Sequence, residues 1–338
     1  MRSLVGKPVL LVSFGGTIAM TGDAGEGVSP TLDVSDLAGT VTDLVNVEIT
    51  TLQLRMVPGV ELGLDDVLEL ARVVDHSSAK GFAGIVVTQG TDTLEETAFA
   101  LDFLVDGQVP VVLTGAMVSP SLPGADGAAN LLDAIAVASS GSTVGFGPVV
   151  VMAGEVHAAA LVRKTHPSSP HAFTSITGPL GWVTEGQPVL VTEPVGRNRP
   201  AAGALRAGSV VREGVAVALV KIGLDDEGRL LDAVKGAFDG LAIEAPGAGH
   251  VPATLVNPLE ELAASMPVLL CSRTGGGPLL RRTYGFPGSE RDLLERGLIS
   301  AGYLDGLKAR VALALLLRAG AGHKEIASVM RERYGARE

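Results

Sequence analysis

Short apolar runs alternate with longer segments of helical spacing along the first half of the chain, and this alternation constrains the fold more than any other feature. Runs of this kind, rich in Val and Leu, are typical of parallel strands that are buried on both faces, with helices packed over them. The pattern therefore predicts an α/β fold. The predicted strands are Pro8–Val12, Gly84–Thr88, Val109–Thr114 and Pro148–Met152, and helices are predicted at Glu95–Leu104 and Asn130–Ala138.

The alternation is interrupted once, by a stretch rich in Pro, Gly and Arg that has no hydrophobic period. We interpret residues 193–213 as a linker between a larger N-terminal domain with a mostly parallel sheet (1–192) and a smaller C-terminal α/β domain (214–338). A long irregular loop is expected from Arg273 to about Asp292. The other elements predicted after the linker are strands at Val215–Val220, Gly240–Glu244 and Val268–Cys271, and helices at Leu230–Phe238, Val256–Ala264, Leu307–Leu317 and Lys324–Tyr334.

Composition excludes several classes of protein. Apolar residues make up 46% of the chain and charged residues 19%, which suits a buried core and argues against disorder. The balance of 26 Lys and Arg against 37 Asp and Glu gives a net charge of −11, which argues against non-specific binding to nucleic acid. The apolar runs are too short to span a bilayer or to form the core of a signal peptide. We therefore expect a soluble cytoplasmic protein.

The only cysteine, Cys271, lies in the apolar run Pro267–Ser272, where we expect a buried thiol and not a nucleophile. One cysteine also excludes an internal disulfide framework and a multi-thiolate zinc site. Four histidines lack metal-ligand spacing, so surface or turn positions are expected for them, and no phosphate-binding glycine motif occurs. No metal and no cofactor are expected. These histidines are His157, His166, His171 and His250.

Polar residues follow the predicted strands, at the edge of the sheet where α/β proteins bind ligands. The first strand leads into SFGGTIA, in which Thr17 comes directly after Gly15 and Gly16. The glycines allow a tight turn and a close approach of the backbone to a ligand. A hydroxyl there suits a nucleophile, but a glycine turn with a helix-capping threonine explains the same residues.

The second strand ends in TQGTDTLEETA, where Thr93 and Glu96 fit a capping box at the start of the next helix. Gly90, Thr91 and Asp92 then belong to the loop at the sheet edge. A hydroxyl beside a carboxylate is suggestive of catalysis, although Thr and Asp are also ordinary turn residues.

Lys164 lies in the segment LVRKTHPSSP of the same domain. A lysine desolvated among apolar neighbours can act as a base. Most lysines are solvated surface groups, so this residue alone does not point to catalysis.

Together these segments resemble the bacterial L-asparaginase/glutaminase family. GGTIA (Gly15–Ala19) matches its first signature and QGTDTLEETA (Gln89–Ala98) its second. VVLTGAM, ADGAANLLDA, the RKT around Lys164, YGF near Tyr284 and LKARVALALLL match further family segments in the right order. The resemblance covers nearly the whole chain and implies the same pair of domains, a larger N-terminal and a smaller C-terminal one.

The resemblance also implies an activity: hydrolysis of L-asparagine to L-aspartate and ammonia. Thr17 is the implied nucleophile, forming an acyl-enzyme that water cleaves. Thr91, Lys164 and Asp92 form the implied second triad, with Lys164 as base and Asp92 also meeting the α-amino group of the substrate. Backbone N–H groups of the Gly90–Thr91 loop and near Ala116 are candidates for stabilising the oxyanion.

Family members assemble as homotetramers of intimate dimers, in which C-terminal residues of one subunit complete the site of its neighbour. A homo-oligomer, dimer or tetramer, is therefore expected, with a small amino-acid amide as the ligand and neither nucleic acid nor a membrane as a partner. We could not align the carboxylate that a neighbour supplies, and Glu290 is our candidate for it.

Two departures from the family pattern concern activation and selectivity. The family carries a tyrosine in the loop after the nucleophile, whereas Met20–Pro30 contains none, so Tyr284 or an arginine of Arg273–Arg282 is our candidate replacement. The pair of polar side chains that holds the substrate α-carboxylate aligns with Gly59 and Val60. Only backbone N–H groups remain there to bind a carboxylate.

Three alternatives stay open. The substrate is glutamine or another small amide, or the chain is an asparaginase-like ligand-binding protein that has lost activity. The third is the amidase component of a tRNA-dependent amidotransferase, against which we set the acidic charge and a chain that begins only a few residues before its first strand.

Overall fold

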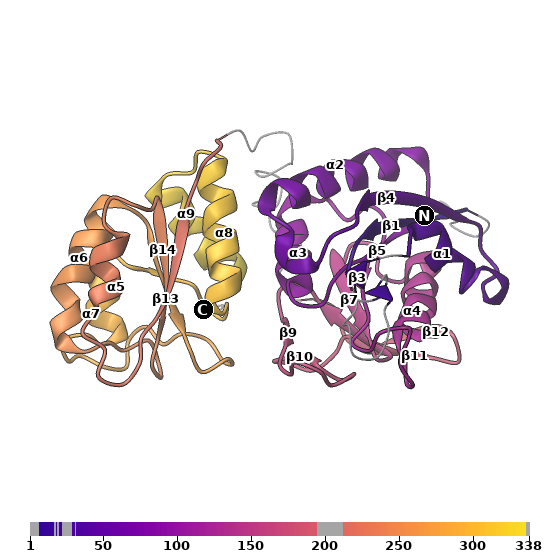
Figure 1. Ribbon diagram of the computed structural model, residues 1–338. Helices are drawn as coiled ribbons and strands as arrows, with labels where there is room; N and C mark the ends of the chain where they lie inside the picture. Colours follow the sequence, from indigo (N-terminus) through magenta and orange to yellow (C-terminus); the bar gives the residue numbers. More distant parts are fainter. Residues whose placement is uncertain are drawn as a thin grey trace. The chain divides into compact units, whose positions relative to one another are not determined.

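The computed structural model describes residues 7–16, 18, 20–21, 29–30, 32–194 and 212–335. The chain divides into two compact units, Met1–Arg197 and Asn198–Glu338, called here the N-terminal and the C-terminal unit (Figure 1). Most of the predicted linker, 193–213, lies outside the described residues, so its boundaries stay a prediction.

An eight-stranded sheet forms the centre of the N-terminal unit, in the order β12-β11-β8-β7-β6-β5-β1-β4. The strands from β4 to β7 pair in parallel, whereas β8, β11 and β12 add an antiparallel edge. The expectation of a mostly parallel sheet is therefore confirmed. The strands are β1 (Val9–Phe14), β4 (Ile49–Arg55), β5 (Gly84–Thr88), β6 (Val111–Thr114), β7 (Pro148–Met152), β8 (Glu155–Ala158), β11 (Gly181–Thr184) and β12 (Gln187–Leu190).

Helices cover both faces of this sheet (Figure 1). Successive strand residues point to opposite faces, and on one face Val9 and Leu11 join a core cluster with Leu131 and Ile135 of α4. α2 and α3 pack against each other and against other strands of the sheet. The helices are α1 (Val34–Gly39), α2 (Leu64–Lys80), α3 (Leu94–Leu104) and α4 (Gly127–Ser140), with short 3-10 turns η2 (Thr42–Leu44) and η3 (Gly59–Glu61).

Two small antiparallel pairs complete the N-terminal unit. β9 (Val162–Lys164) pairs with β10 (Phe173–Ser175), so that Lys164 lies opposite Phe173. β2 (Met20–Thr21) pairs with β3 (Ser29–Pro30) in the segment after the first signature.

The C-terminal unit is a second, smaller parallel sheet with the order β13-β14-β15-β16. Cys271 is fully buried in this core, and its burial raises the pKa of the thiol well above its ordinary value, which confirms the expectation of an inert core residue. The elements are β13 (Val217–Lys221), α5 (Arg229–Val234), β14 (Gly240–Ala245), η5 (Ala253–Leu255), α6 (Val256–Ser265), β15 (Val268–Ser272), α7 (Glu290–Glu295), β16 (Ile299–Ser300), α8 (Gly306–Arg318) and α9 (His323–Tyr334).

The structure confirms the predicted architecture of a larger and a smaller α/β unit. β5 and β7 have the predicted bounds, and the long loop after β15 ends where α7 begins, at Glu290. Within the described part of the chain, no helix combines the length and the apolar character that crossing a bilayer requires.

Candidate active site

Four loops meet at the carboxyl edge of the large sheet, and each contributes a glycine at the point of contact. A Cβ built on Gly16 lies 2.0 Å from the backbone N of Gly90, and one on Gly115 lies 2.5 Å from the carbonyl oxygen of Gln89. Gly59 and Gly90 are also in close contact, since a Cβ on Gly90 would lie 2.9 Å from the backbone N of Gly59. No side chain fits between these segments, so the glycines set the positions of the residues beside them.

The first signature reaches this edge at Gly15 and Gly16, which have φ values of +85° and +98°. Thr17 itself lies outside the described residues, so its place in the site stays a prediction. Ile18 is buried against Gly127 at the start of α4. Most of the loop Met20–Pro30 is likewise outside the described residues.

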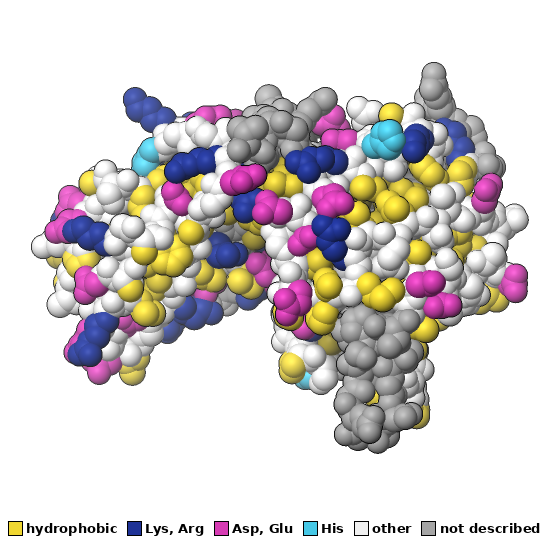
Figure 2. All heavy atoms as spheres, turned by 45° about the horizontal axis from the view of Figure 1, so that its top comes forward, with side chains coloured by type: hydrophobic (Ala, Val, Ile, Leu, Met, Phe, Trp, Pro, Cys, Tyr) yellow, Lys and Arg dark blue, Asp and Glu magenta, His cyan; other side chains and the backbone are white. Residues whose placement is uncertain are grey.

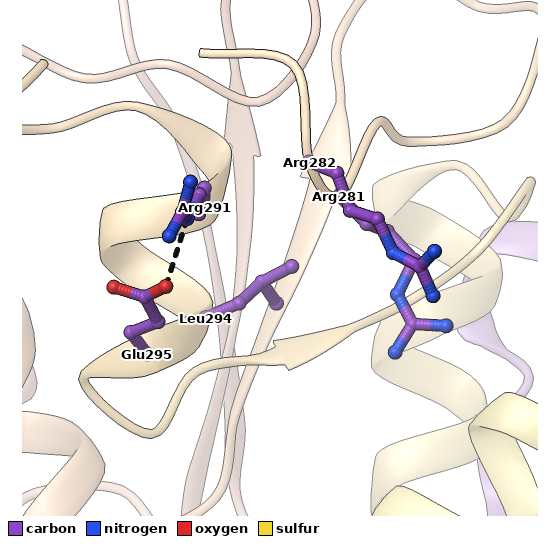
Figure 3. Close-up of a pocket in the computed structure, with 5 residues that line it drawn as sticks. All are labelled: Arg281, Arg282, Arg291, Leu294 and Glu295. Carbon is purple, nitrogen blue, oxygen red and sulfur yellow. Dashed lines mark hydrogen bonds and ion pairs between the residues drawn. The ribbon is translucent and has the colours of Figure 1, made fainter. Parts of the chain in front are cut away.

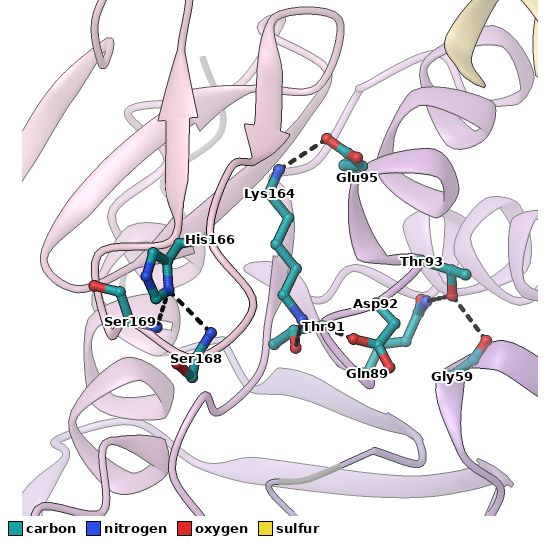
Figure 4. Close-up of polar contacts among 10 residues, drawn as sticks. All are labelled: Gly59, Gln89, Thr91, Asp92, Thr93, Glu95, Lys164, His166, Ser168 and Ser169. Carbon is teal, nitrogen blue, oxygen red and sulfur yellow. Dashed lines mark hydrogen bonds and ion pairs between the residues drawn. The ribbon is translucent and has the colours of Figure 1, made fainter. Parts of the chain in front are cut away.

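Thr91, Asp92 and Lys164 come together at the same edge (Figure 4). Nζ of Lys164 donates to Oγ1 of Thr91 at 2.8 Å and to Oδ1 of Asp92 at 2.7 Å. The contact joins the loop after β5 to strand β9, more than seventy residues later in the chain. Sequence alone does not give this contact, because it depends on how β9 crosses the edge of the sheet.

A buried carboxylate of α3 fixes the strand that carries the lysine. Oε2 of Glu95 accepts the backbone N–H of Lys164 at 3.0 Å, and Glu95 is only 6% exposed. Sequence analysis missed this role of Glu95. The side chain of Lys164 then runs from Glu95 toward Thr91 and Asp92 (Figure 4).

The three groups differ in their access to solvent. The side chain of Lys164 is 13% exposed and that of Asp92 is 64% exposed, whereas Thr91 is buried. The ammonium therefore has its charge-assisted hydrogen bonds in a mostly desolvated place, where they are stronger than in water. A hydroxyl in contact with an amine is the arrangement that activates an oxygen nucleophile or relays a proton. The exposed carboxylate beside them suits a cationic ligand.

The predicted capping box at α3 is wrong. Thr93 precedes the helix, but its side chain makes no cap hydrogen bond. Its hydroxyl instead donates to the carbonyl oxygen of Gly59 at 2.8 Å and accepts from Nε2 of Gln89 at 3.1 Å. A tertiary contact replaces the local one and links the loop after β5 to the turn η3.

The candidate clamp residues differ in where they lie. Gly59 is buried beside Gly90, whereas Val60 is 63% exposed. Their positions agree with a carboxylate-binding role for backbone only, and that role stays a prediction.

Two polar residues of α4 and its N-cap hold the loop around Ala116, and sequence analysis missed both. Oδ1 of Asp126 accepts the backbone N–H groups of Met117 and Val118 at 3.0 and 2.9 Å. Nδ2 of Asn130 donates to the carbonyl of Gly115 at 3.0 Å. Both residues lie in the segment ADGAANLLDA, whose match to the family was the sequence signal that could have pointed to them. Ala116 is thereby fixed and buried at the sheet edge.

In the C-terminal unit, Glu290 is fully buried and Tyr284 is 43% exposed. One carboxylate oxygen of Glu290 accepts the backbone N–H groups of Thr283 and Tyr284 at 2.9 and 3.0 Å, and the other lies 3.1 Å from Nε2 of His250. Burial alone raises the pKa of Glu290, but these hydrogen bonds outweigh it and the pKa lies below its ordinary value. Glu290 thus positions the loop that carries Tyr284. Contact of either residue with a substrate stays a prediction.

The expected surface position of His157 is wrong, since this histidine is fully buried in β8. Its ring lies between Oγ of Ser175 at 3.0 Å and Oε2 of Glu155 at 3.3 Å. His166 does lie in a turn, where Nδ1 accepts the backbone N–H groups of Ser168 and Ser169. Among the residues that the structure describes, no three His, Cys, Asp or Glu side chains are grouped to hold a metal ion.

The two α/β units and the polar residues at this sheet edge suit an amidohydrolase, and comparisons with known proteins identify the family. Residues 8–196 match the family Asparaginase, N-terminal, and residues 216–330 match the Glutaminase/Asparaginase C-terminal domain. The chain belongs to the asparaginase/glutaminase family, whose members are amidohydrolases.

Similar proteins carry names of the same kind. A probable L-asparaginase of Deinococcus radiodurans is 35% identical over 325 residues, covering 95% of this chain and 96% of that protein. A glutaminase-asparaginase of Acinetobacter glutaminasificans is 31% identical over 338 residues, covering 94% and 97%. The crystal structure of a probable cytoplasmic L-asparaginase from Campylobacter jejuni superposes with a TM-score of 0.85 at 26% identity, covering 96% and 99% of the two chains.

Proposed function

We propose that this amidohydrolase converts L-asparagine and water to L-aspartate and ammonia through a threonine nucleophile. The observation that carries the proposal is the contact of Lys164 with both Thr91 and Asp92 at the sheet edge. The first signature supplies the nucleophile, Thr17, and its neighbour Gly16 packs on the backbone of Gly90.

The proposed reaction has two steps. Oγ of Thr17 attacks the amide carbon, the C–N bond breaks, and ammonia leaves with the proton that the hydroxyl gave up. Water then attacks the ester, which releases aspartate and restores the hydroxyl. In its neutral form, Lys164 accepts the proton of Thr91 while Thr91 accepts the proton of the attacking hydroxyl, and the same pair returns a proton to the leaving ammonia.

Recognition of the amino acid falls to groups of opposite charge. The exposed carboxylate of Asp92 suits the α-amino group, while backbone N–H groups near Gly59 suit the α-carboxylate. Backbone N–H groups at Gly90 and Ala116 are the proposed oxyanion donors, a kind of group often worth about 3 kcal/mol each.

A second candidate substrate is glutamine or another small amide. The observation that favours it is the pair Gly59 and Val60, which offers no polar side chain to hold the α-carboxylate of the substrate. Sites that lose polar partners lose discrimination between related substrates. The similarity to a glutaminase-asparaginase supports the same alternative.

Assembly and location belong to the same proposal. It includes a homo-oligomer, dimer or tetramer, in which a neighbouring subunit completes the site. Tyr284 is the candidate to replace the tyrosine that Met20–Pro30 lacks. A cytoplasmic location is supported by the name of the Campylobacter relative.

The test is ammonia release by the purified protein from L-asparagine, D-asparagine and L-glutamine in parallel, with Thr17→Ala as the matched variant. Saturable release from L-asparagine that Thr17→Ala abolishes supports the proposal. Release from L-glutamine at a similar rate assigns the second substrate. Unchanged hydrolysis by Thr17→Ala contradicts the mechanism, and binding of asparagine without any release identifies an inactive ligand-binding protein.

A further inference from the structure

We propose that two adjoining pockets of the C-terminal unit form a binding site for a small organic anion, one that joins a phosphate or carboxylate group to an apolar body. The site is made by the loop before α7, by α7 itself and by residues of β16 and α9. None of its lining residues takes part in the contacts among Lys164, Thr91 and Asp92.

The first pocket is basic. It has a volume of about 460 Å³, and the described residues that line it are Arg281, Arg282, Arg291, Leu294 and Glu295. Arg281 and Arg282 lie on one side of the pocket and Arg291 with Glu295 on the other (Figure 3). Three arginines and one carboxylate thus line this pocket.

That carboxylate is already engaged. Oε1 of Glu295 accepts from Nε of Arg291 at 2.9 Å, in an ion pair on one turn of α7. Arg281 is exposed and has no ion pair within the part of the chain that the structure describes. Like charges that share a space repel one another, and an anion between them relieves the repulsion. Arginine also binds phosphate and carboxylate through two parallel hydrogen bonds, which adds geometric selectivity.

The second pocket is apolar in its floor and continues from the first, because Arg281 and Leu294 line both. It has a volume of about 260 Å³. Leu279 and Leu298, which belong to the core of this unit, line its floor. The apolar body of a ligand whose anionic group binds the arginines therefore meets an apolar surface, as in most small-molecule sites.

An arginine and a histidine also line this second pocket. Arg331 lines it from α9, and the closest side-chain contact described for its guanidinium is 3.5 Å to Oγ of Ser328. His323 lines it as well, with Nε2 within 3.2 Å of the carbonyl of Gly297. The polar end of a ligand in both pockets thus meets the arginines of the first pocket, and its body meets Leu279 and Leu298, with Arg331 also within reach.

The positive net charge of this pocket lining is opposite in sign to the net charge of the whole chain. The chain carries a net charge of −11, and Figure 2 shows basic and acidic side chains interspersed over the face it presents. In the two pockets the described lining holds four arginines and one acidic residue. Phosphate and carboxylate ligands share the chemistry that recognises such a site, so the experiment includes one probe of each.

The test is isothermal titration of the full-length protein with phenyl phosphate, benzoate and inorganic phosphate. Saturable binding of phenyl phosphate or benzoate at one site per chain is expected, with inorganic phosphate at least about ten-fold weaker because it lacks the apolar body. The stronger of the two aromatic probes assigns the natural ligand to phosphates or to carboxylates. Absence of saturable binding for both aromatic probes overturns the proposal.

Variants locate the binding. Arg281→Gln, at the exposed residue common to both pockets, should weaken binding about ten-fold, the loss expected for one charge-assisted hydrogen bond. Arg229→Gln removes an equal charge from an exposed arginine that lines neither pocket, and binding should not change. Equal weakening by both variants means that only net charge matters and contradicts a built site. Lys164→Met should lose hydrolysis but keep this binding, which separates failure here from failure of the proposed activity.

Discussion

The two parallel sheets of this molecule present the same kind of edge, but they use polar residues there in opposite ways. At the large sheet, Lys164, Thr91 and Asp92 contact one another, and the carboxylate remains open to solvent. At the small sheet, two carboxylates are buried and hold backbone: Glu244 accepts the N–H of Gly306, and Glu290 accepts two N–H groups of its own loop.

The difference lies in what fixes the loops. In the N-terminal unit, glycine contacts such as that of Gly16 with Gly90 hold the loops together with the carboxylates of Asp126 and Glu95. Lys164, Thr91 and Asp92 are then left to contact one another. In the C-terminal unit, Glu244 and Glu290 take on the task of fixing loops themselves. A sheet edge of this kind therefore becomes a candidate active site when other groups fix its loops and leave a hydroxyl, an amine and a carboxylate in contact.

Removing the amine at the large sheet should have the largest effect. We expect Lys164→Met to lower the rate of ammonia release about a thousand-fold, because it removes the only base in contact with Thr91 among the described residues, and general base catalysis is typically worth 10²–10⁴. Lys235→Met, at an exposed ion pair of the C-terminal unit, serves as the control. A rate near that of the unaltered protein for Lys164→Met contradicts the assigned role.

A substitution at Gly16 tests whether close glycine contacts hold the loops at the edge of the large sheet. Gly16→Ala should lower the free energy of unfolding by about 3 kcal/mol, since φ is +98° and the new Cβ lies 2.0 Å from the backbone N of Gly90. Gly276→Ala, at a glycine with nothing within 4 Å, should change it by less than about 0.5 kcal/mol. Urea unfolding of both variants measures the difference, and equal stabilities would mean that the loops at the large sheet are not held by close packing.

The carboxylate of Glu290 should matter for stability in a pH-dependent way. We expect Glu290→Gln to cost about 2 kcal/mol at neutral pH, because one ionised acceptor of two backbone N–H groups is lost. Since the pKa is lowered in the folded state, the stabilisation is present above the ordinary carboxyl pKa near 4 and is lost as the pH falls through the lower folded value. The gap between the two proteins should therefore close below about pH 4. Thermal melts at pH 7 and pH 3.5 check this, and a constant gap would rule out ionisation as the cause.

The smallest expected effect comes from His157. Burial lowers its pKa, although Glu155 opposes the shift, so the folded chain resists protonation. The unfolded chain takes up a proton near pH 6.5, and stability should fall by about 1 kcal/mol between pH 7 and pH 5. His157→Gln should flatten this part of the profile, whereas His76→Gln, at an exposed histidine of α2, should leave it. The same slope in both variants would assign the pH dependence elsewhere.

Most of the fold could be predicted from sequence because its central strands are buried on both faces. Val-rich runs such as Gly84–Thr88 and Pro148–Met152 carry that signal directly. The edge strands and the strand beside one of them do not. Ile49–Arg55, at one edge, is only partly buried. Gln187–Leu190, at the other edge, and its neighbour Gly181–Thr184 alternate between exposed and covered positions over a few residues. Edge strands therefore lack the continuous apolar run on which the prediction rested.

The candidate site was predictable as a set of residues but not as a set of contacts. The signatures pointed to Thr91 and Asp92, and the family resemblance added Lys164, yet their meeting depends on strand β9 and on Glu95. For Thr93 the local rule failed, since its hydroxyl found Gly59, thirty-four residues away, instead of the helix end. A hydrogen bond to a distant part of the chain replaces the local helix cap here, because the fold brings the carbonyl of Gly59 within reach of the Thr93 hydroxyl.

The most direct test of the central claim compares two threonines that differ in what they touch. Thr91→Val removes the hydroxyl that contacts Lys164, and Thr174→Val removes an exposed hydroxyl from strand β10. Ammonia release from L-asparagine should fall at least about a hundred-fold in Thr91→Val, with the fold intact, and stay within about two-fold in Thr174→Val. Undiminished release by a folded Thr91→Val variant would contradict the claim that this edge carries out the hydrolysis.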